Sequence, residues 1–467
     1  MEKNVFKGYA VRKLILSLTL ILVLAVVSES LAAEFRSFSD NLTERVEINL
    51  NRADQHDASE LMRYSHIADL KNKFPEGYVS FSSRLDSFLG RGEISLPVKV
   101  NLTDAAYPGF SGLKIIRGSY FNNRALKYGR NVAVISRDLA ERLFMSIDAV
   151  GNEITLFDET YVITGLYEQS KTFVSLLGSD GSEIVYVPYT SYMGNGDLPV
   201  DTVFIHDRKL GEAGFRRSMT EDILKKVLGI NAEAYRIIDY YGADTMASQW
   251  LGLLQFLVAL WTAFLLLGIA GKFMRKMKDF ICVGCRQDYL FEFLKKQHAP
   301  ILIFTGKLLG LVGLSVILIL YTRPRVFIPS DYLPADNIFD LSFYCTRVRE
   351  TIQASNAMAG YTPTLMEHRL HTTSGVGFLL FILMVSAFVS LNSAIKLSKF
   401  LMYPVKRYIV LFVLSSGLST ILLLLIWISG LIDLSIGIKS VALLVLFYSV
   451  NILRKGSAHN ANTVRAP

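Results

Sequence analysis

The sequence predicts an α-helical membrane protein with about six transmembrane helices and an α+β extracytoplasmic domain inserted between helices 1 and 2. Hydrophobic residues make up 51% of the 467 residues, and the mean hydropathy is +0.35. This composition is too apolar for an ordinary soluble protein, whereas charged residues, at 19%, are too frequent for a membrane bundle alone. A membrane bundle that carries one sizeable water-exposed domain satisfies both observations.

Residues 1–33 are predicted to form a cytoplasmic start and transmembrane helix 1. An apolar run over 14–27 follows four basic residues and precedes the small residues Ala32 and Ala33. A cleaved signal peptide has this pattern. A retained membrane helix has it too, because residues 14–33 span about 30 Å at 1.5 Å per residue. Both alternatives place the following residues outside the cytoplasm.

Residues 34–247 contain no apolar segment of membrane length and are predicted to form the extracytoplasmic domain. Residues 38–75 are predicted to be mainly helical, with a surface helix over 63–70. Further along, β-rich runs punctuated by glycine predict strands over 78–81, 94–102, 112–118, 132–136, 154–157, 160–166, 183–188, 203–206 and 234–239. Helical spacing over 137–144 and 215–228 completes an α+β pattern.

Further apolar segments predict transmembrane helices 2 to 6 over 250–271, 300–321, 378–394, 408–430 and 436–453. With six spans, every loop rich in Lys and Arg falls on one side, which the positive-inside pattern identifies as the cytoplasm. The predicted units after the outside domain are helices 2 and 3 (248–321) with a cytoplasmic loop over 272–299, a long outer loop (322–371), helix 4 with a basic cytoplasmic loop (372–407), and an extra hairpin with the cytoplasmic tail (408–467).

The cytoplasmic loop 272–299 has a strong excess of positive charge. It contains Lys272, Arg275, Lys276, Lys278, Arg286, Lys295 and Lys296 against Asp279, Asp288 and Glu292. Apolar residues at three- and four-residue spacing predict a short amphipathic helix that is broken once, with Gly284 at the turn. Such a helix, tied to two membrane helices, can receive force from a soluble partner.

The composition also excludes several classes of function. The net charge of +8 comes from basic residues beside apolar segments, so the positive-inside pattern accounts for it and nucleic-acid binding is not expected. Three cysteines, Cys282, Cys285 and Cys345, cannot form a disulfide framework. The single C-x-x-C pair favours helix packing over a zinc or redox site. No paired-carboxylate or Ser/His/Asp constellation indicates an enzyme, so no catalytic or metal-binding residue is predicted.

Two stretches resemble the permease family that includes MacB and FtsX. In the outside domain, residues 116–121 (IRGSYF) are similar to the family's G-R-x-F motif. The blocks that follow are 129–136 (GRNVAVIS), 139–144 (LAERLF), 149–154 (AVGNEI), 161–166 (YVITGL) and 184–188 (IVYVP). Their order and spacing resemble the MacB-type periplasmic core domain, which the resemblance assigns to residues 34–247.

The second stretch, 278–289 (KDFICVGCRQDY), is similar to the family's segment R-E-I-G-x-x-[KR]-A-[LI]-G-A between spans 2 and 3. Asp279 stands where the family usually has Glu, Gly284 falls on its glycine, and Cys285 falls on its small residue. The third span resembles the small-residue helix that follows, and close helix packing through its glycines is favoured over simple lipid contact. The chain departs from the family in loop 322–371 and in the hairpin of spans 5 and 6.

This resemblance implies the permease subunit of an ABC transporter in a bacterial cell membrane. In such permeases, closure of a cytoplasmic ATPase dimer moves a coupling helix, and the spans pass the motion to the outside domain. The implied ATPase-coupling residues are Lys276, Lys278, Asp279, Phe280, Ile281, Gly284, Cys285 and Tyr289, and the implied helix-packing residues are Gly306, Gly310 and Gly313.

ATP and Mg²⁺ are expected on a separate ATPase chain, with no cofactor on this one. The fragment 305–308 (TGKL) lies in a span and lacks the Ser or Thr that holds Mg²⁺ in a phosphate-binding loop. The other expected partners are membrane lipid and a second permease, identical or different. The implied function is export or extraction of peptides, lipids or lipoproteins. The alternative is an FtsX-like regulator that activates a cell-wall hydrolase or a sensor and transports nothing itself.

Overall fold

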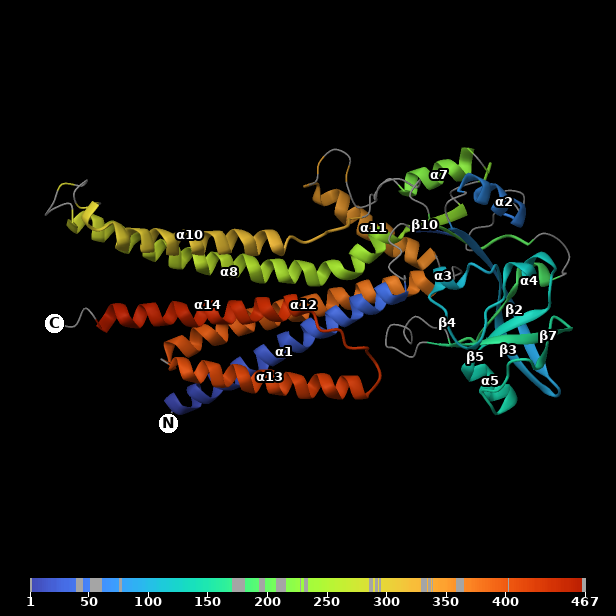
Figure 1. Cartoon of the computed structure of the whole chain (residues 1–467), viewed down its shortest axis with the longest axis horizontal. Helices are drawn as coiled ribbons and strands as arrows, with labels where there is room; N and C mark the ends of the chain where they lie inside the picture. The colour runs from blue at the N-terminus through green and yellow to red at the C-terminus, as the bar shows by residue number, and fades with distance from the viewer. Residues whose placement is uncertain are drawn as a thin grey trace. The chain divides into compact units, whose positions relative to one another are not determined.

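The computed structural model describes residues 2–38, 45–50, 61–74, 78–169, 181–192, 198–206, 216–226, 228–230, 234–284, 289, 293, 295–328, 334, 337, 339–357, 365–401 and 403–463 (Figure 1). The chain divides into two compact units. The sheet unit comprises Ala32–Ala247 and Phe327–Ser374. The helix unit comprises Met1–Leu31, Ser248–Val326 and Gly375–Pro467. Helices α1, α8 and α12 each contribute residues to both units.

The sheet unit is built on a ten-stranded sheet. Its strands are β1 Arg45–Leu50, β2 Tyr78–Arg91, β3 Ile94–Thr103, β4 Lys114–Gly118, β5 Val132–Ser136, β6 Glu153–Leu156, β7 Glu159–Glu168, β8 Ile184–Pro188, β9 Thr202–His206 and β10 Tyr235–Asp239. The order is β10-β1-β9-β2-β3-β8-β5-β7-β4, and β6 pairs with both β2 and β7. Strands β2, β3, β8, β5, β7 and β6 therefore close into a ring, from which β9, β1 and β10 extend.

Two cores occupy the two faces of this sheet. Aliphatic side chains from alternate positions, such as Val98, Val100 and Leu102 on β3, are buried in the larger core. The other face carries an aromatic core with members including Tyr107, Phe110, Tyr167, Tyr186 and Phe204. The strands of the ring thus bury side chains on both faces, which explains why short compact apolar runs marked them in the sequence.

The sheet unit also contains shorter helices. They are α2 Tyr64–Lys73, α3 Pro108–Ser111, α4 Asn123–Lys127, α5 Arg137–Phe144, the 3₁₀ turn Tyr189–Ser191, α7 Arg216–Lys226 and α11 Leu341–Ala357. Helix α5 shows why these bounds arise. Ser136 caps it by accepting a hydrogen bond from the Leu139 amide at 3.0 Å, and Leu139, Ala140 and Leu143 are buried in the larger core.

The helix unit contains long apolar helices. They are α1 Glu2–Phe38, α8 Tyr240–Gly284, α10 His298–Tyr321, α12 Leu365–Phe400, α13 Val405–Ile428 and α14 Ile438–Thr463. Among the described residues, the first five contain segments long and apolar enough to cross a membrane, and α14 contains the shorter apolar segment Ile438–Leu453. The predicted class, a helical membrane protein with an inserted α+β domain, is confirmed.

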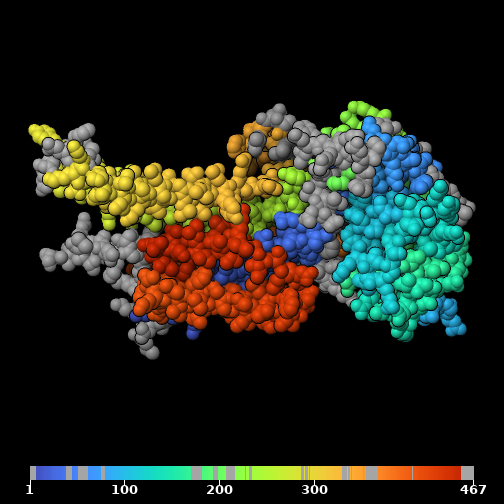
Figure 2. All heavy atoms as spheres, viewed as in Figure 1, coloured from blue at the N-terminus to red at the C-terminus, as the bar shows by residue number. Residues whose placement is uncertain are grey.

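Small polar side chains join the helices of this unit. Ser419 on α13 donates to the Thr19 carbonyl of α1 at 3.4 Å, and the Ser435 amide donates to Ser30 of α1 at 2.9 Å. Gln255 of α8 donates to Ser440 of α14 at 2.8 Å. The hairpin α13–α14, in which the chain departs from the resembling family, is thus packed against α1 and α8 by hydrogen bonds. The helices α10 and α13 are largely uncovered on the face seen in Figure 2.

Three expectations differ from the structure. Residues 38–75 were expected to be mainly helical, but 45–50 form β1, because Val46, Ile48 and Leu50 alternate with polar residues and the strand pairs between β10 and β9. Loop 322–371 contains α11 and the start of α12. Residues 272–284 do not form a separate amphipathic helix. They continue α8 unbroken to Gly284, because no proline or glycine interrupts 272–283.

Candidate coupling site and outer joint

The C-terminal end of α8 carries most of the predicted coupling residues. Lys276, Lys278 and Asp279 are exposed on its last turns, whereas Phe280 and Ile281 are half-buried. Tyr289 lies beyond the helix and is 85% exposed, so its ring is free to meet a partner. Cys285, also predicted for this site, lies outside the described residues. Cys282 is an exposed free thiol, and no cluster of three or more metal-binding side chains occurs in the described part of the chain.

An aromatic cluster fixes this end of α8 to α10. The ring of Phe280 lies 5.5 Å from Phe293 and 6.4 Å from Phe304, and Phe273 lies 6.4 Å from Phe304. Gly284 ends the helix where the Phe293 ring packs, and a Cβ at position 284 would overlap that ring. Helices α8 and α10 run side by side here (Figure 1). Gly284 therefore permits the aromatic contact that closes the hairpin.

The predicted helix-packing glycines lie on α10. A Cβ added at Gly306, Gly310 or Gly313 would meet nothing within 4 Å. The described part of this chain therefore makes no close packing contact at these three glycines.

The glycines of the outside motifs have a different role. Gly118 has a φ of +71°, and a Cβ there would overlap the Thr164 carbonyl oxygen. A Cβ at Gly165 would lie 2.6 Å from the Ser119 carbonyl oxygen. The Ser119 amide donates to the Thr164 carbonyl at 2.9 Å. These two motif blocks thus meet where β4 and β7 approach too closely for a side chain.

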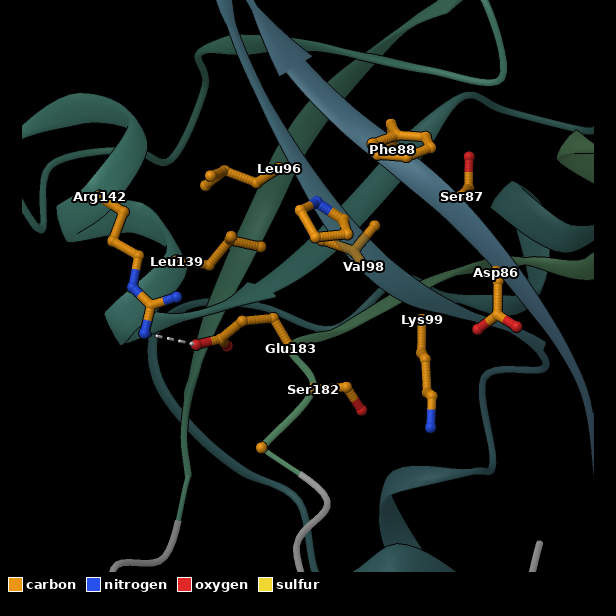
Figure 3. A pocket seen from close by; sticks show the side chains of 12 residues that line it. Asp86, Ser87, Phe88, Leu96, Val98, Lys99, Leu139, Arg142, Ser182 and Glu183 are labelled. Carbon is orange, nitrogen blue, oxygen red and sulfur yellow. Dashed lines mark ion pairs between the residues drawn. The ribbon is translucent and has the colours of Figure 1, made fainter.

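An open pocket of about 690 Å³ lies between β2, β3 and α5 (Figure 3). Its apolar lining is Phe88, Leu96, Pro97, Val98 and Leu139, and its polar lining includes Asp86, Lys99, Ser182, Arg142 and Glu183. Glu183 is mostly buried, accepts from Ser136 at 2.6 Å and lies 3.5 Å from the Arg142 guanidinium. The Glu183 carboxylate therefore fixes the Ser136 hydroxyl that caps the start of α5.

Proline closes the exposed edge of β3 beside this pocket. The Lys99 amide donates to the Glu183 carbonyl at 2.8 Å, where β3 begins to pair with β8. Pro97, two residues earlier, presents its backbone to the same edge but has no amide hydrogen. The β3–β8 ladder therefore begins only at Lys99, and Pro97 offers no amide hydrogen to which another strand could pair at this edge.

Burial changes the acid–base behaviour of the tyrosines in the aromatic core. Burial raises the pKa of Tyr107 to about 12. It also raises the pKa of Tyr120 and of Tyr186 well above the ordinary value, and neighbouring tyrosines add to both effects. These phenols remain protonated at neutral pH and act as packing groups.

Sequence reasoning missed a buried charged cluster in the sheet unit, here called the outer joint. It consists of Glu34 on α1, Arg45 and Glu47 on β1, Tyr240 on α8, and Glu367 on α12, all buried. Arg45 lies over the Tyr240 ring at 3.7 Å, and Tyr240 donates its hydroxyl proton to Glu47. Glu367 pairs with Arg236 at 2.7 Å. Its members are scattered from residue 34 to residue 367, so no local spacing announced the cluster.

Comparison with known families identifies the outside domain. Residues 14–207 match the family described as the MacB-like periplasmic core domain. The chain contains a MacB-like periplasmic core domain. The predicted resemblance of the outside domain to the MacB-type periplasmic core domain is therefore confirmed. Together with the apolar helices, the MacB-like domain indicates a multi-pass membrane protein.

Solved structures similar to this chain include the periplasmic region of MacB from Actinobacillus actinomycetemcomitans, at 14% identity and a TM-score of 0.36, covering 44% of this chain and 91% of that one. The extracellular domain of the noncanonic ABC-type transporter YknZ from Gram-positive bacteria matches at 18% identity and a TM-score of 0.33, covering 42% and 99%. A domain of a putative permease protein from Porphyromonas gingivalis matches at 16% and 0.30, covering 42% and 91%. A comparison with curated protein sequences gives no significant match.

Proposed function

We propose that this chain is an ABC-transporter permease that couples ATP hydrolysis on a separate ATPase to a conformational change of its MacB-like domain. The observation that carries the proposal is the insertion of that domain between two apolar helices, α1 and α8. Because both helices contribute residues to the sheet unit as well as to the helix unit, a displacement of the helices can act directly on the sheet.

The ATPase contact is proposed at the end of α8. Exposed Lys276 and Lys278 would orient the partner, and half-buried Phe280 with exposed Tyr289 would provide apolar anchors. Since the aromatic cluster ties α8 to α10, a push on this end would move both helices together. The proposed task is export or extraction of peptides, lipids or lipoproteins, and a regulator of a cell-wall hydrolase is the alternative outcome.

The test measures binding of a purified ABC ATPase, encoded by a neighbouring gene, to the full chain in lipid nanodiscs. Phe280→Asp and Gly284→Asp are expected to weaken binding at least tenfold, because each disrupts the aromatic end of α8. Lys276→Glu, which leaves that packing intact, is expected to slow association mainly at low salt. Phe88→Asp makes the same chemical change at a 66% exposed ring in the MacB-like domain and should leave binding unchanged.

Unchanged binding by both aspartate variants at the end of α8 would contradict the coupling proposal. If binding behaves as expected, transport and hydrolase activation are then compared in cells that lack the chain. Loss of hydrolase activation without loss of any transport would favour the regulatory alternative.

A further inference from the structure

The outer joint contains a buried guanidinium whose hydrogen-bonding capacity is only partly used. Arg45 begins β1, between β10 and β9, and its side chain is fully buried. Its Nη1 donates to the Phe110 carbonyl, and its plane lies over the Tyr240 ring. Its Nε and Nη2 are buried and have no hydrogen-bond partner among the described residues. Arginine offers five N–H donors, so this position is under-bonded.

Two carboxylates of the joint are engaged by other groups. Glu47, two residues along β1, accepts from the Tyr240 hydroxyl and from Asn49 at 2.9 Å. Glu367 is paired with Arg236.

Buried unpaired donors are rare in stable packing, and where they occur they mark strain or a second arrangement. Tyr240 both covers Arg45 and occupies Glu47, and it is the first residue of α8. If the first turn of α8 moves away from β1, Glu47 loses the tyrosine and becomes available, and Arg45 loses its aromatic cover. One movement therefore frees an acceptor and exposes the donors that need one.

We propose that Arg45 is a positioning residue of a two-state joint: it holds the start of α8 on β1 in the arrangement seen here, and it stabilises an open arrangement by pairing with Glu47. Its part in a transport cycle rests on the proposed function. The opening itself is a property of this chain and does not depend on an ATPase.

Arg45→Met tests the proposal, because methionine fills the site without charge or donors. Among the described residues Arg45 forms no ion pair in the arrangement seen here, so the replacement breaks none, whereas removing one partner of a buried pair is strongly destabilising. The full chain in nanodiscs is therefore expected to keep or raise its Tm. Amide exchange in β1 and in Tyr240–Ala247 is expected to slow at least tenfold, because the open arrangement loses its ion pair. Arg45→Lys, which retains a charge, should restore part of the wild-type exchange rate.

Arg216→Met is the matched control in the same unit. Arg216 is also buried, but it pairs with Asp239 at 3.4 Å, so its removal leaves a buried carboxylate unpaired. This variant is expected to lower the Tm and to speed exchange. If Arg45→Met behaves like Arg216→Met, Arg45 is an ordinary structural ion and the proposal is overturned.

A second measurement separates this proposal from the proposed function. With the ATPase and ATP present, wild-type chain should show faster exchange at the joint, and Arg45→Met should bind the ATPase normally but lose at least tenfold of that acceleration. Slowed exchange in the isolated variant, without any ATP response in the wild type, would support the two-state joint and count against coupling to ATP. Faster or unchanged exchange in the isolated variant would reject the joint regardless of the ATPase result.

Discussion

A Cβ added at Gly165 of β7 would lie 2.6 Å from the Ser119 carbonyl oxygen, whereas one added at Gly306, Gly310 or Gly313 of α10 would meet nothing within 4 Å. Both sets of glycines belong to stretches that resemble the same family. In the sheet unit, contacts made by the chain itself demand glycine. On α10 they do not, so the reason for glycine there lies in what surrounds the helix.

The comparison separates two kinds of motif. A motif whose residues touch each other, such as 116–121 with 161–166, specifies the fold of its own domain. A motif whose residues have open space around them in the described part of the chain, such as the α10 glycines, is explained by a partner or by lipid. Substitutions in the first kind of motif should therefore lower the stability of the domain. Substitutions in the second kind should weaken association with a partner.

The largest expected effect is that of Gly165→Ala. A methyl group there would overlap a backbone oxygen, which cannot rotate away, so β4 and β7 must separate. We expect a loss of more than about 3 kcal/mol in the free energy of unfolding of the sheet unit. Gly151→Ala is the control, because Gly151 has a φ of +89° but open space around it, and should lose only about 1–2 kcal/mol. Chemical denaturation followed by near-UV circular dichroism measures both, and an equal loss would refute the steric explanation.

The sequence predicts the parts of this fold that depend on local pattern. Strand β5 and helix α5 have the predicted bounds, because a compact apolar run ends at Ser136, which caps the following helix. The start of the sheet unit is different. Strand β1 is stabilised by β9 and β10, more than 150 residues away in the chain, and its alternation of Val46, Ile48 and Leu50 with polar residues extends over only six residues.

The functional regions divide in the same way. The end of α8 was predicted as a coupling segment from its charge and family resemblance, although its helix continues from the membrane span instead of standing apart. The outer joint was not predicted, since Glu34, Arg45, Tyr240 and Glu367 are unremarkable in their local sequences. They are brought together only by the strand pairing of β1 and by the ends of α1, α8 and α12. Neither arrangement produces a periodic pattern in the sequence.

Alkaline pH tests the packing of the sheet unit in a second way. Burial raises the pKa of Tyr107 to about 12, above the ordinary value of 10.0. The unfolded chain releases this proton near pH 10 and the folded chain retains it, so the stabilisation is complete below pH 10 and is lost as the pH rises to 12. Two pKa units correspond to about 2.7 kcal/mol. Tyr107→Phe should therefore lose less stability than wild type between pH 9 and pH 12.

Thermal unfolding across this pH range measures the difference. Tyr128→Phe removes a phenol that is 65% exposed and should leave the wild-type pH profile unchanged. An identical decline in the wild type and in Tyr107→Phe would show that the Tyr107 ring reaches water in the folded protein.

The smallest effect on folding is expected from Gly310→Ala. Alanine has open space at this position and is a better helix former than glycine, so the chain alone should be unchanged or more stable by up to about 1 kcal/mol. If α10 packs closely against a second permease, however, the added methyl group would hold the two backbones apart. We expect weaker self-association, measured by energy transfer between labelled chains in lipid bilayers. Leu309→Ala, at a neighbouring side chain that is 66% exposed, is the control. If self-association is unaffected by Gly310→Ala, the glycine face of α10 contacts lipid. The glycines of the sheet unit would then be required by close backbone contacts, and those of α10 would not be required by any packing contact.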